Sequence, residues 1–244
     1  MQLSDFDLSA KLSTKEYEKL LKKQQIELIS IGRKVFEKKI PVVLMMEGWD
    51  AAGKGGVIKR ITAFLDPRGY TAYGIGAPTE IEKNHHYLWR FWNKLPEGGK
   101  AAIFDRSWYG RVLVERVEKL AKEVEWKRAY KEINKFEKTL AANGTIVIKV
   151  FLSISKAEQL RRFRKRQQNK LTRWKLTPDD WRNRSKWGEY EKAINEMLEK
   201  TSTKHTPWHV IASDDKKFMR IAVAKTIITT IEKALKKRGI VYRM

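Results

Sequence analysis

The 244-residue sequence contains no cysteine, which excludes disulfide bonds, thiolate metal ligands and a cysteine nucleophile. It has four histidines, and their spacing does not suggest a zinc site. No apolar run approaches the length needed to span a bilayer, and residues 1–10 are polar and acidic, unlike a signal peptide. We therefore expect a soluble cytoplasmic protein with no membrane partner.

Acidic residues are scarce relative to basic ones. The chain has 29 Asp and Glu against 52 Lys and Arg, a formal net charge of +23. Such an excess predicts a polyanionic partner, with nucleic acid as the first class to consider. Between residues 156 and 187, which we call the basic segment, twelve basic residues face three acidic ones (Glu158, Asp179 and Asp180). A solvated helix face would normally interleave the two signs. The basic segment therefore predicts contact with phosphate.

Apolar and aromatic residues are plentiful enough for a folded core, at 42% and 11% of the chain. Apolar runs at residues 40–46, 71–76, 101–104, 145–152 and 208–211 predict five strands. Helical spacing follows a capping box of Ser13 and Glu16, recurs at 57–65, 87–92 and 126–140, and closes the chain after a cap at Asp214. This alternation predicts an α/β fold with a parallel sheet, and ligands at the carboxyl ends of its strands. No linker or repeat divides the chain, so we expect one domain over residues 1–244.

A phosphate-binding loop is predicted between the first strand and the helix after it. The loop matches the pattern G-x-x-x-x-G-K and reads Gly48-Trp49-Asp50-Ala51-Ala52-Gly53-Lys54-Gly55, followed by Gly56. A glycine-rich turn that enters a helix aims several backbone N–H groups at one point, and the lysine adds a full positive charge. We predict that phosphate is bound by Gly48, Ala51, Ala52, Gly53, Lys54, Gly55 and Gly56.

Gly55 stands where such loops usually carry a Ser or Thr whose hydroxyl ligates Mg²⁺. The metal must therefore find other oxygens. Asp50 lies inside the loop, and Asp105 ends the predicted third strand beside it. Alternatively, Asp50 closes a turn on its own backbone, and Asp105 caps a helix that starts near Ser107. Arg106 is placed to stabilise a transferring phosphate, or else forms a surface ion pair.

Four spaced motifs resemble the second family of polyphosphate kinases. They occupy residues 47–56, 77–80, 104–117 and 180–184, within a similarity that runs from about residue 13 to 237. The resemblance implies a three-layer P-loop kinase fold similar to thymidylate kinase, with a parallel five-stranded sheet and a basic helical lid at about residues 156–192. It also implies Mg²⁺-dependent phosphate transfer between inorganic polyphosphate and purine nucleotides. The segments at 87–92 and 105–116 resemble the branch that phosphorylates AMP.

The resemblance also implies roles for individual residues. It makes Asp50, Lys54, Asp105, Arg106 and Arg166 catalytic. Asp50 and Asp105 would hold Mg²⁺, or Asp50 would orient the attacking nucleotide phosphate. Arg162 would bind phosphate with Arg166, although any one lid arginine could instead face solvent or another subunit. Nucleotide-binding residues would be Thr79, Glu80, Arg111, Glu115 and Arg116. The protein would form a homo-oligomer, a dimer or a tetramer.

The sequence thus predicts a polyphosphate-dependent nucleotide kinase that converts AMP to ADP. Two alternatives within the same chemistry are a transferase that makes ATP or GTP from the diphosphate and an ATP-dependent kinase of a small molecule. A nucleic-acid-binding P-loop protein is suggested by charge alone. The sequence shows no readable recognition helix and no aromatic platform for single strands, so no specific nucleic acid partner is expected.

Overall fold

A five-stranded parallel sheet forms the centre of the protein. The computed structural model describes residues 1–241. The strands are β1 (Val42–Gly48), β2 (Tyr70–Gly74), β3 (Ala101–Asp105), β4 (Ile146–Ser153) and β5 (Trp208–Ala212). Their order across the sheet is β2-β3-β1-β4-β5, and every neighbouring pair is parallel. The predicted five-stranded parallel sheet is confirmed.

The central strands are buried because helices cover both faces of the sheet. All eight residues of β4 and six of the seven in β1 are buried, as expected for a parallel sheet that reads as a continuous apolar run. By contrast, β2 lies at an edge and is partly exposed. The register pairs Met46 with Asp105 and Gly48 with Leu152. The phosphate loop and Asp105 therefore leave the sheet side by side, at its carboxyl edge.

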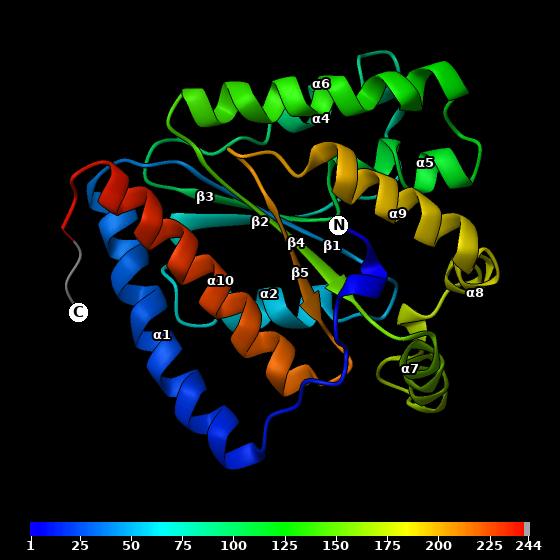
Figure 1. Ribbon diagram of the computed structural model, residues 1–244, viewed down its shortest axis with the longest axis horizontal. Helices are drawn as coiled ribbons and strands as arrows, with labels where there is room; N and C mark the ends of the chain where they lie inside the picture. The colour runs from blue at the N-terminus through cyan, green and yellow to red at the C-terminus, as the bar shows by residue number, and fades with distance from the viewer. Residues whose placement is uncertain (242–244) are drawn as a thin grey trace.

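Helices form the two outer layers. Figure 1 shows α1 (Thr14–Glu37), α2 (Lys54–Thr62) and α10 (Lys216–Lys237) on one side of the sheet, and α6 (Glu123–Ala142) and α9 (Trp187–Thr201) on the other. The predicted capping box of Ser13 and Glu16 starts α1. The shorter helices are η1 (Leu3–Asp5), η2 (Pro67–Gly69), α3 (Glu80–Lys83), α4 (Trp89–Trp92), η3 (Trp108–Arg111) and α5 (Val114–Val117). The three-layer α/β sandwich is thus as predicted.

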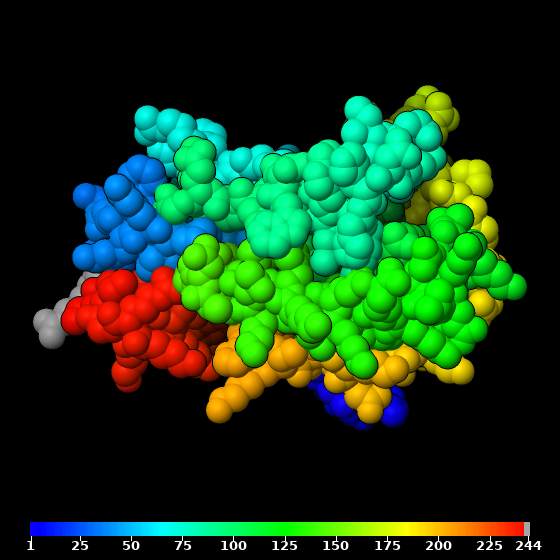
Figure 2. All heavy atoms as spheres, turned by 90° about the horizontal axis from the view of Figure 1, so that it is seen from above, coloured from blue at the N-terminus to red at the C-terminus, as the bar shows by residue number. Residues whose placement is uncertain are grey.

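The basic segment folds into α7 (Lys156–Gln168), η4 (Arg173–Lys175) and α8 (Pro178–Ser185), and it ends at the first residue of α9. Because α7 follows β4 directly, the segment lies at the carboxyl end of the sheet. Figures 1 and 2 both place α8 and the start of α9, in yellow, at the far end of the molecule from the red end of α10. Within residues 1–241, no helix is both long and apolar enough to cross a membrane.

Three local predictions differ from the structure. Asp215, not Asp214, caps α10 by accepting a hydrogen bond from the Phe218 amide, while Asp214 accepts one from the Ser155 amide. The two neighbouring aspartates could not be separated from the sequence, because either lies within capping distance of the helix. The helix predicted at 87–92 is only the four-residue α4, and the helix expected after Asp105 is divided between η3 and α5. Both segments are short and aromatic, and packing sets their conformation.

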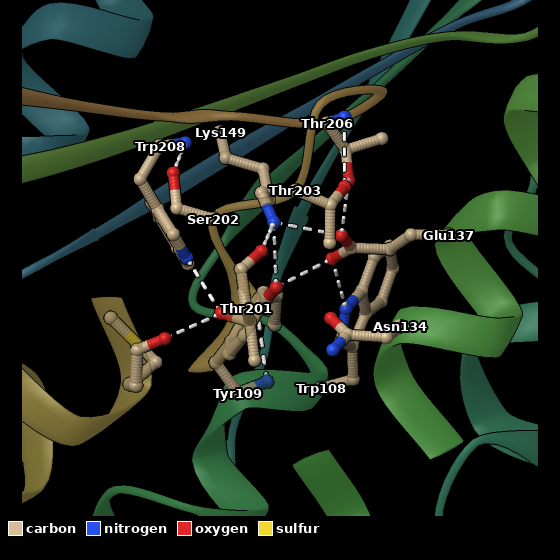
Figure 3. A network of polar contacts seen from close by, with 12 residues as sticks. Trp108, Tyr109, Asn134, Glu137, Lys149, Thr201, Ser202, Thr203, Thr206 and Trp208 are labelled. Carbon is tan, nitrogen blue, oxygen red and sulfur yellow. Dashed lines mark hydrogen bonds and ion pairs between the residues drawn. The ribbon is translucent and has the colours of Figure 1, made fainter. Parts of the chain in front are cut away.

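A buried polar network fixes η3 against three neighbouring elements (Figure 3). The Glu137 carboxylate on α6 accepts hydrogen bonds from Trp108 Nε1 at 3.0 Å, Tyr109 Oη at 2.7 Å and Thr206 Oγ1 at 2.9 Å. Lys149 Nζ on β4 donates to Glu137 Oε2 at 2.8 Å, and both side chains are 0% exposed. Both oxygens of Glu137 accept hydrogen bonds, and Lys149 supplies the opposite charge. Hydrogen bonds of this kind are what make a buried ion pair tolerable.

Candidate active site

The phosphate loop, residues 48–55, is shaped by two glycines that no other residue could replace. Gly48 has a φ of 143°, and a Cβ there would lie 2.5 Å from the Leu152 carbonyl oxygen of β4. Gly53 has a φ of 118°, and a Cβ there would lie 3.1 Å from Met219 Cε of α10. A side chain would adopt a disfavoured backbone conformation at either position, and at Gly48 it would also clash with the backbone of β4. The sequence pattern therefore encodes the path of the loop.

The end of the loop presents free backbone donors. Within residues 1–241, the amides of Gly53, Lys54, Gly55 and Gly56 donate to no backbone or side-chain acceptor. The last three form the first turn of α2, where no intrahelical acceptor exists and the helix dipole is positive. Gly55 and Gly56 are exposed. These four N–H groups are a ready-made site for an anion.

Lys54 is folded back onto its own loop. Its Nζ donates to the carbonyl oxygens of Gly48 at 2.7 Å and Trp49 at 3.2 Å. Both acceptors are neutral, so a phosphate placed at the four free amides would compete for the ammonium group with a full negative charge. The lysine is therefore held next to the anion site by bonds that an anion can replace.

The Asp50 carboxylate is shared between two elements. Its Oδ1 lies 3.2 Å from Arg106 Nη2, and its Oδ2 accepts a hydrogen bond from Asn183 Nδ2 of α8 at 2.9 Å. Its backbone oxygen accepts a bond from Gln159 Nε2 of α7 at 3.0 Å. The alternative in which Asp50 closes a turn on its own backbone is therefore wrong, because both carboxylate oxygens bond to distant residues.

Asp105 lies opposite Gly55. A Cβ at Gly55 would be 3.6 Å from Asp105 Oδ2, so the carboxylate occupies the side of the loop where the usual hydroxyl would point. Within residues 1–241, no side chain or amide donates to this carboxylate. The helical cap after β3 is Ser107, whose Oγ accepts from the Tyr109 amide. The capping alternative for Asp105 is thus wrong, and its oxygens are left facing the loop.

Arg106 lies among acids. Burial opposes its charge, but the carboxylates of Asp50, Glu47, Asp105 and Asp180 outweigh that effect and raise the pKa of Arg106. Its side chain remains 52% exposed, and its φ of 67° turns it out of the sheet toward the loop. The guanidinium is a fixed positive charge at the mouth of the site, on a side chain that is half exposed.

Glu47 is a site residue that the sequence analysis did not assign. It is the penultimate residue of β1 and is buried, and Ser107 Oγ donates to its Oε1 at 2.7 Å. Burial raises the pKa of Glu47, although the hydrogen bond from Ser107 and the charges of Lys54 and Arg106 oppose the shift. A small cavity of about 90 Å³ is lined by Glu47, Asp50, Arg106, Asn183 and Tyr190, among others. An acid at the end of a buried strand was the available signal.

Arg162 braces the loop from behind. It is 4% exposed, and its Nη1 donates to the carbonyl oxygens of Ala51 at 3.0 Å and Ala52 at 2.9 Å. Its Nη2 donates to those of Ser213 and Asp214, and its Nε to Glu158 at 2.7 Å. All three nitrogens are thus committed to protein oxygens. In this arrangement Arg162 joins the loop to the connection between β5 and α10.

A group of cations flanks the loop on the α10 side. Within residues 1–241, Arg166, Lys165 and Lys216 form no ion pair, in contrast to Arg161, which pairs with Glu158. Burial lowers the pKa of Lys216, and the charges of Arg162, Arg220, Lys165 and Arg166 lower it further. Lys216 lies one helical turn before Met219, which contacts Gly53. Like charges gathered without acidic partners favour the binding of an anion.

The residues predicted to bind nucleotide are dispersed. Thr79 caps α3 and Glu80 pairs with Lys83, and both are exposed. Arg111 pairs with Glu115 at 3.1 Å and stacks over Tyr87. Burial raises the pKa of Glu115. Arg116 donates to Glu196 and to Tyr130 Oη, which fixes it between α6 and α9.

These five residues do not line the 90 Å³ cavity, which Gly110 and Val114 reach instead. Thr79 and Glu80 are open to solvent, whereas Arg116 is already engaged within the protein.

Within residues 1–241, no group of three or more His, Cys, Asp or Glu side chains could enclose a metal. A closed cluster is not needed for Mg²⁺, which is usually held by one or two carboxylates, several waters and substrate phosphates. Asp105, whose carboxylate accepts no hydrogen bond within residues 1–241, and Asp50, whose oxygens lie 3.2 Å from Arg106 and 2.9 Å from Asn183, would supply such a pair. The site has the parts of a P-loop kinase: an amide cradle, a lysine, two carboxylates and cations around them.

The sequence matches the Polyphosphate kinase 2 (PPK2) family over residues 11–239, and the chain belongs to that family. It is 48% identical over 232 residues to a polyphosphate:AMP phosphotransferase of Pseudomonas syringae pv. tomato, covering 95% of this chain and 47% of that protein. It is 41% identical over 215 residues to an ADP-polyphosphate phosphotransferase of Pseudomonas aeruginosa, covering 88% and 71%. The crystal structure of polyphosphate kinase 2 from Arthrobacter aurescens TC1 superimposes with a TM-score of 0.92 at 33% identity, covering 100% and 88%.

These findings confirm the resemblance and the P-loop kinase fold. The chain spans about half the length of the polyphosphate:AMP phosphotransferases that it matches. It spans most of the Arthrobacter structure.

Proposed function

We propose that the protein transfers a phosphoryl group from inorganic polyphosphate to a nucleotide, with AMP converted to ADP. The observation that carries the proposal is the set of cations at Lys165, Arg166 and Lys216, which gather around the start of α10, next to the loop, and form no ion pair within residues 1–241. A nucleoside triphosphate would be neutralised by the loop, its lysine and Mg²⁺. A longer chain of phosphates would extend past the loop and require further cations.

We assign a separate role in phosphoryl transfer to each group of residues in the site. Lys54 and the amides of residues 53–56 hold the phosphates at the scissile bond, and Arg106 closes over the transferring group. Asp50 and Asp105 would hold Mg²⁺, which would supply positive charge to neutralise the reacting phosphates. Arg166 guides the polyphosphate chain, whereas Arg162 keeps the loop in shape. The basic segment acts as a lid.

The choice between AMP and ADP as acceptor depends on how far from the loop the nucleoside is held. The terminal phosphate of the nucleotide must lie in line with the polyphosphate bond, so an AMP-using enzyme holds the nucleoside one phosphate closer to the loop than an ADP-using one. The relative named for AMP shares 48% identity and the one named for ADP 41%. This difference favours AMP. We assign the nucleoside to the surface near Thr79, Glu80, Arg111 and Glu115.

One experiment separates the candidates. The protein is incubated with polyphosphate, Mg²⁺ and either AMP or ADP, and the nucleotides are then separated by chromatography. We expect ADP from AMP faster than ATP from ADP, and no product without polyphosphate. ATP formation from ADP with no use of AMP would assign the ADP reaction instead. Phosphate transfer from ATP with no polyphosphate requirement would favour a small-molecule kinase.

We further propose that the enzyme works in the cytoplasm as a homo-oligomer, a dimer or a tetramer, and has no specific nucleic acid partner. Its net charge of +23 predicts salt-dependent adhesion to any polyanion. In a competition between polyphosphate and DNA, both should bind at low salt, but polyphosphate alone should be consumed. Light scattering of the purified protein would give the subunit number. Sequence-specific retention of DNA at physiological salt would contradict this part of the proposal.

A further inference from the structure

The contact between Asp50 and α8 is chemically directional. A carboxylate only accepts hydrogen bonds, so the group of Asn183 that faces Asp50 Oδ2 at 2.9 Å must be its NH₂. The amide oxygen of Asn183 then points the other way and needs a donor. Tyr190 Oη of α9 lies 3.1 Å from that oxygen and donates to it. Residue 183 therefore has to donate on one side and accept on the other.

The tyrosine is held in this role by its surroundings. Burial raises the pKa of Tyr190, and the carboxylates of Glu118 and Asp50 raise it further, so the hydroxyl keeps its proton. Glu118 Oε1 lies 3.4 Å from the hydroxyl. The Oε2 of Glu118 receives Arg182 Nε at 3.0 Å and Lys186 Nζ at 2.9 Å. The carboxylate of Glu118, which comes from the end of α5, thus anchors α8 from outside the basic segment.

Two further contacts tie the same parts together. Gln159 Nε2 donates to the Asp50 backbone oxygen, and Gln159 Oε1 accepts from Arg184 Nη1 of α8 at 2.9 Å. The rings of Trp49 and Trp187 stack with centroids 3.7 Å apart and an angle of 3° between their planes. The loop and the basic segment are therefore joined on both sides of Asp50.

We propose that Asn183 is a positioning residue: oriented by Tyr190 and lying on a helix that Glu118 anchors through Arg182, it fixes the Asp50 carboxylate and so couples the placement of the basic segment to the chemistry at the phosphate loop. This inference rests on the proposed phosphoryl transfer and specifies which side chain prepares Asp50 for it. When α8 is in place, one carboxylate oxygen of Asp50 is held by Asn183 and the other lies against Arg106. Without α8, the carboxylate would keep only its contact with Arg106 and would be less restrained.

The chemistry of the pair predicts an order among variants. Asn183→Ala removes the donor, and residues that orient a metal ligand or a catalytic carboxylate typically contribute about 10–100-fold to activity. Asn183→Asp places a second carboxylate against Asp50 and should be worse than alanine. Tyr190→Phe leaves the donor but frees its orientation, so its loss should be smaller.

The kinetic test measures kcat and KM for polyphosphate and AMP in these variants. We expect kcat to fall about 10–100-fold in Asn183→Ala with both KM values little changed, because the substrates do not contact Asn183 in the proposed arrangement. Asn134→Ala is the matched control, since Asn134 Nδ2 also donates one bond, to the Lys200 carbonyl oxygen at 2.9 Å, outside the site. Unchanged kcat in a folded Asn183→Ala protein, or an equal loss in the control, overturns the proposal.

A second measurement does not depend on activity. Amide hydrogen exchange of α8 should be faster in Asn183→Ala than in the wild type and unchanged in Asn134→Ala, because the helix loses its bond to Asp50. If the wild type transfers no phosphate from polyphosphate, the proposed function fails, and exchange still decides the coupling. Equal exchange in all three proteins would overturn it. Faster exchange in Asn183→Ala alone would support it.

Discussion

Replacing Lys149 by methionine should test what the buried network around Glu137 contributes. Lys149 Nζ uses all three of its donors, on Glu137 Oε2 at 2.8 Å, Tyr109 Oη at 2.9 Å and the Thr201 carbonyl oxygen at 2.7 Å. Methionine keeps the length of the side chain and removes the charge. The Glu137 carboxylate would then be buried without a counter-charge. Breaking a buried ion pair in this way costs about 3–5 kcal/mol.

The expected change is large enough to measure directly. For a chain of this size, each kcal/mol shifts the melting temperature by about 2–4 °C, so Lys149→Met should melt about 6–20 °C lower than the wild type. In urea, the midpoint should fall while the slope stays the same. Lys131→Met, on the exposed side of α6, should change stability by no more than about 0.5 kcal/mol.

A second replacement should restore part of the loss. Glu137→Gln in the Lys149→Met background removes the stranded charge and keeps an oxygen for Trp108 Nε1 and Tyr109 Oη. The double variant should therefore be more stable than Lys149→Met alone, a coupling of about 1–3 kcal/mol. The reasoning is refuted if Lys149→Met unfolds within about 1 kcal/mol of the wild type, or if the double variant is the less stable of the two. The second comparison remains informative even where the single variant is poorly folded.

Three further outcomes follow from the site and its flanks. Lys54→Ala should lower turnover about 100-fold or more while its melting temperature stays close to that of the wild type, and wild-type turnover in the folded variant would contradict the role of the loop. Neutralising Lys165 and Arg166 together should weaken polyphosphate binding and reduce its salt dependence, measured by titration at several salt concentrations, because fewer counterions are released; an unchanged slope would place the chain elsewhere. Burial, with help from Lys233 and Lys149, lowers the pKa of His209 below 6.5, so the unfolded chain takes up a proton first as the pH falls. The wild type should therefore lose stability between about pH 7 and pH 5 relative to His209→Gln, and parallel stability curves would refute this.

The sequence predicted the sheet because its strands are apolar runs separated by helical spacing. It predicted the loop because Gly48 and Gly53 have positive φ angles and lie close to β4 and α10, and these are positions that favour glycine. Boundaries were less accurate. The helix expected from residue 57 begins at Lys54. Its first turn contains Gly55 and Gly56, which have no apolar side chains and so add nothing to the helical pattern.

The contacts within the site were harder to predict. Asp50 and Asn183 are 133 residues apart in the chain, and neither their pairing nor the tyrosine that orients it leaves a local pattern. Arg162 and Arg166 are indistinguishable in a run of basic residues, yet one is 4% exposed and the other is partly open to solvent. Local composition gives the charge of such a run. Only the fold determines which of the two arginines is buried against the loop.

The brace formed by Arg162 has a consequence for how the protein is made. Its guanidinium joins the Ala51 and Ala52 carbonyl oxygens to those of Ser213 and Asp214, partners that lie far apart in the order of synthesis. A ribosome that adds about 5–20 residues per second needs about 8 to 32 seconds to pass from one end of this bridge to the other. During that interval the nascent chain carries its complete phosphate-binding sequence without the contact that sets its shape. Capacity to bind phosphate should therefore arise late in translation, once the connection after β5 has emerged.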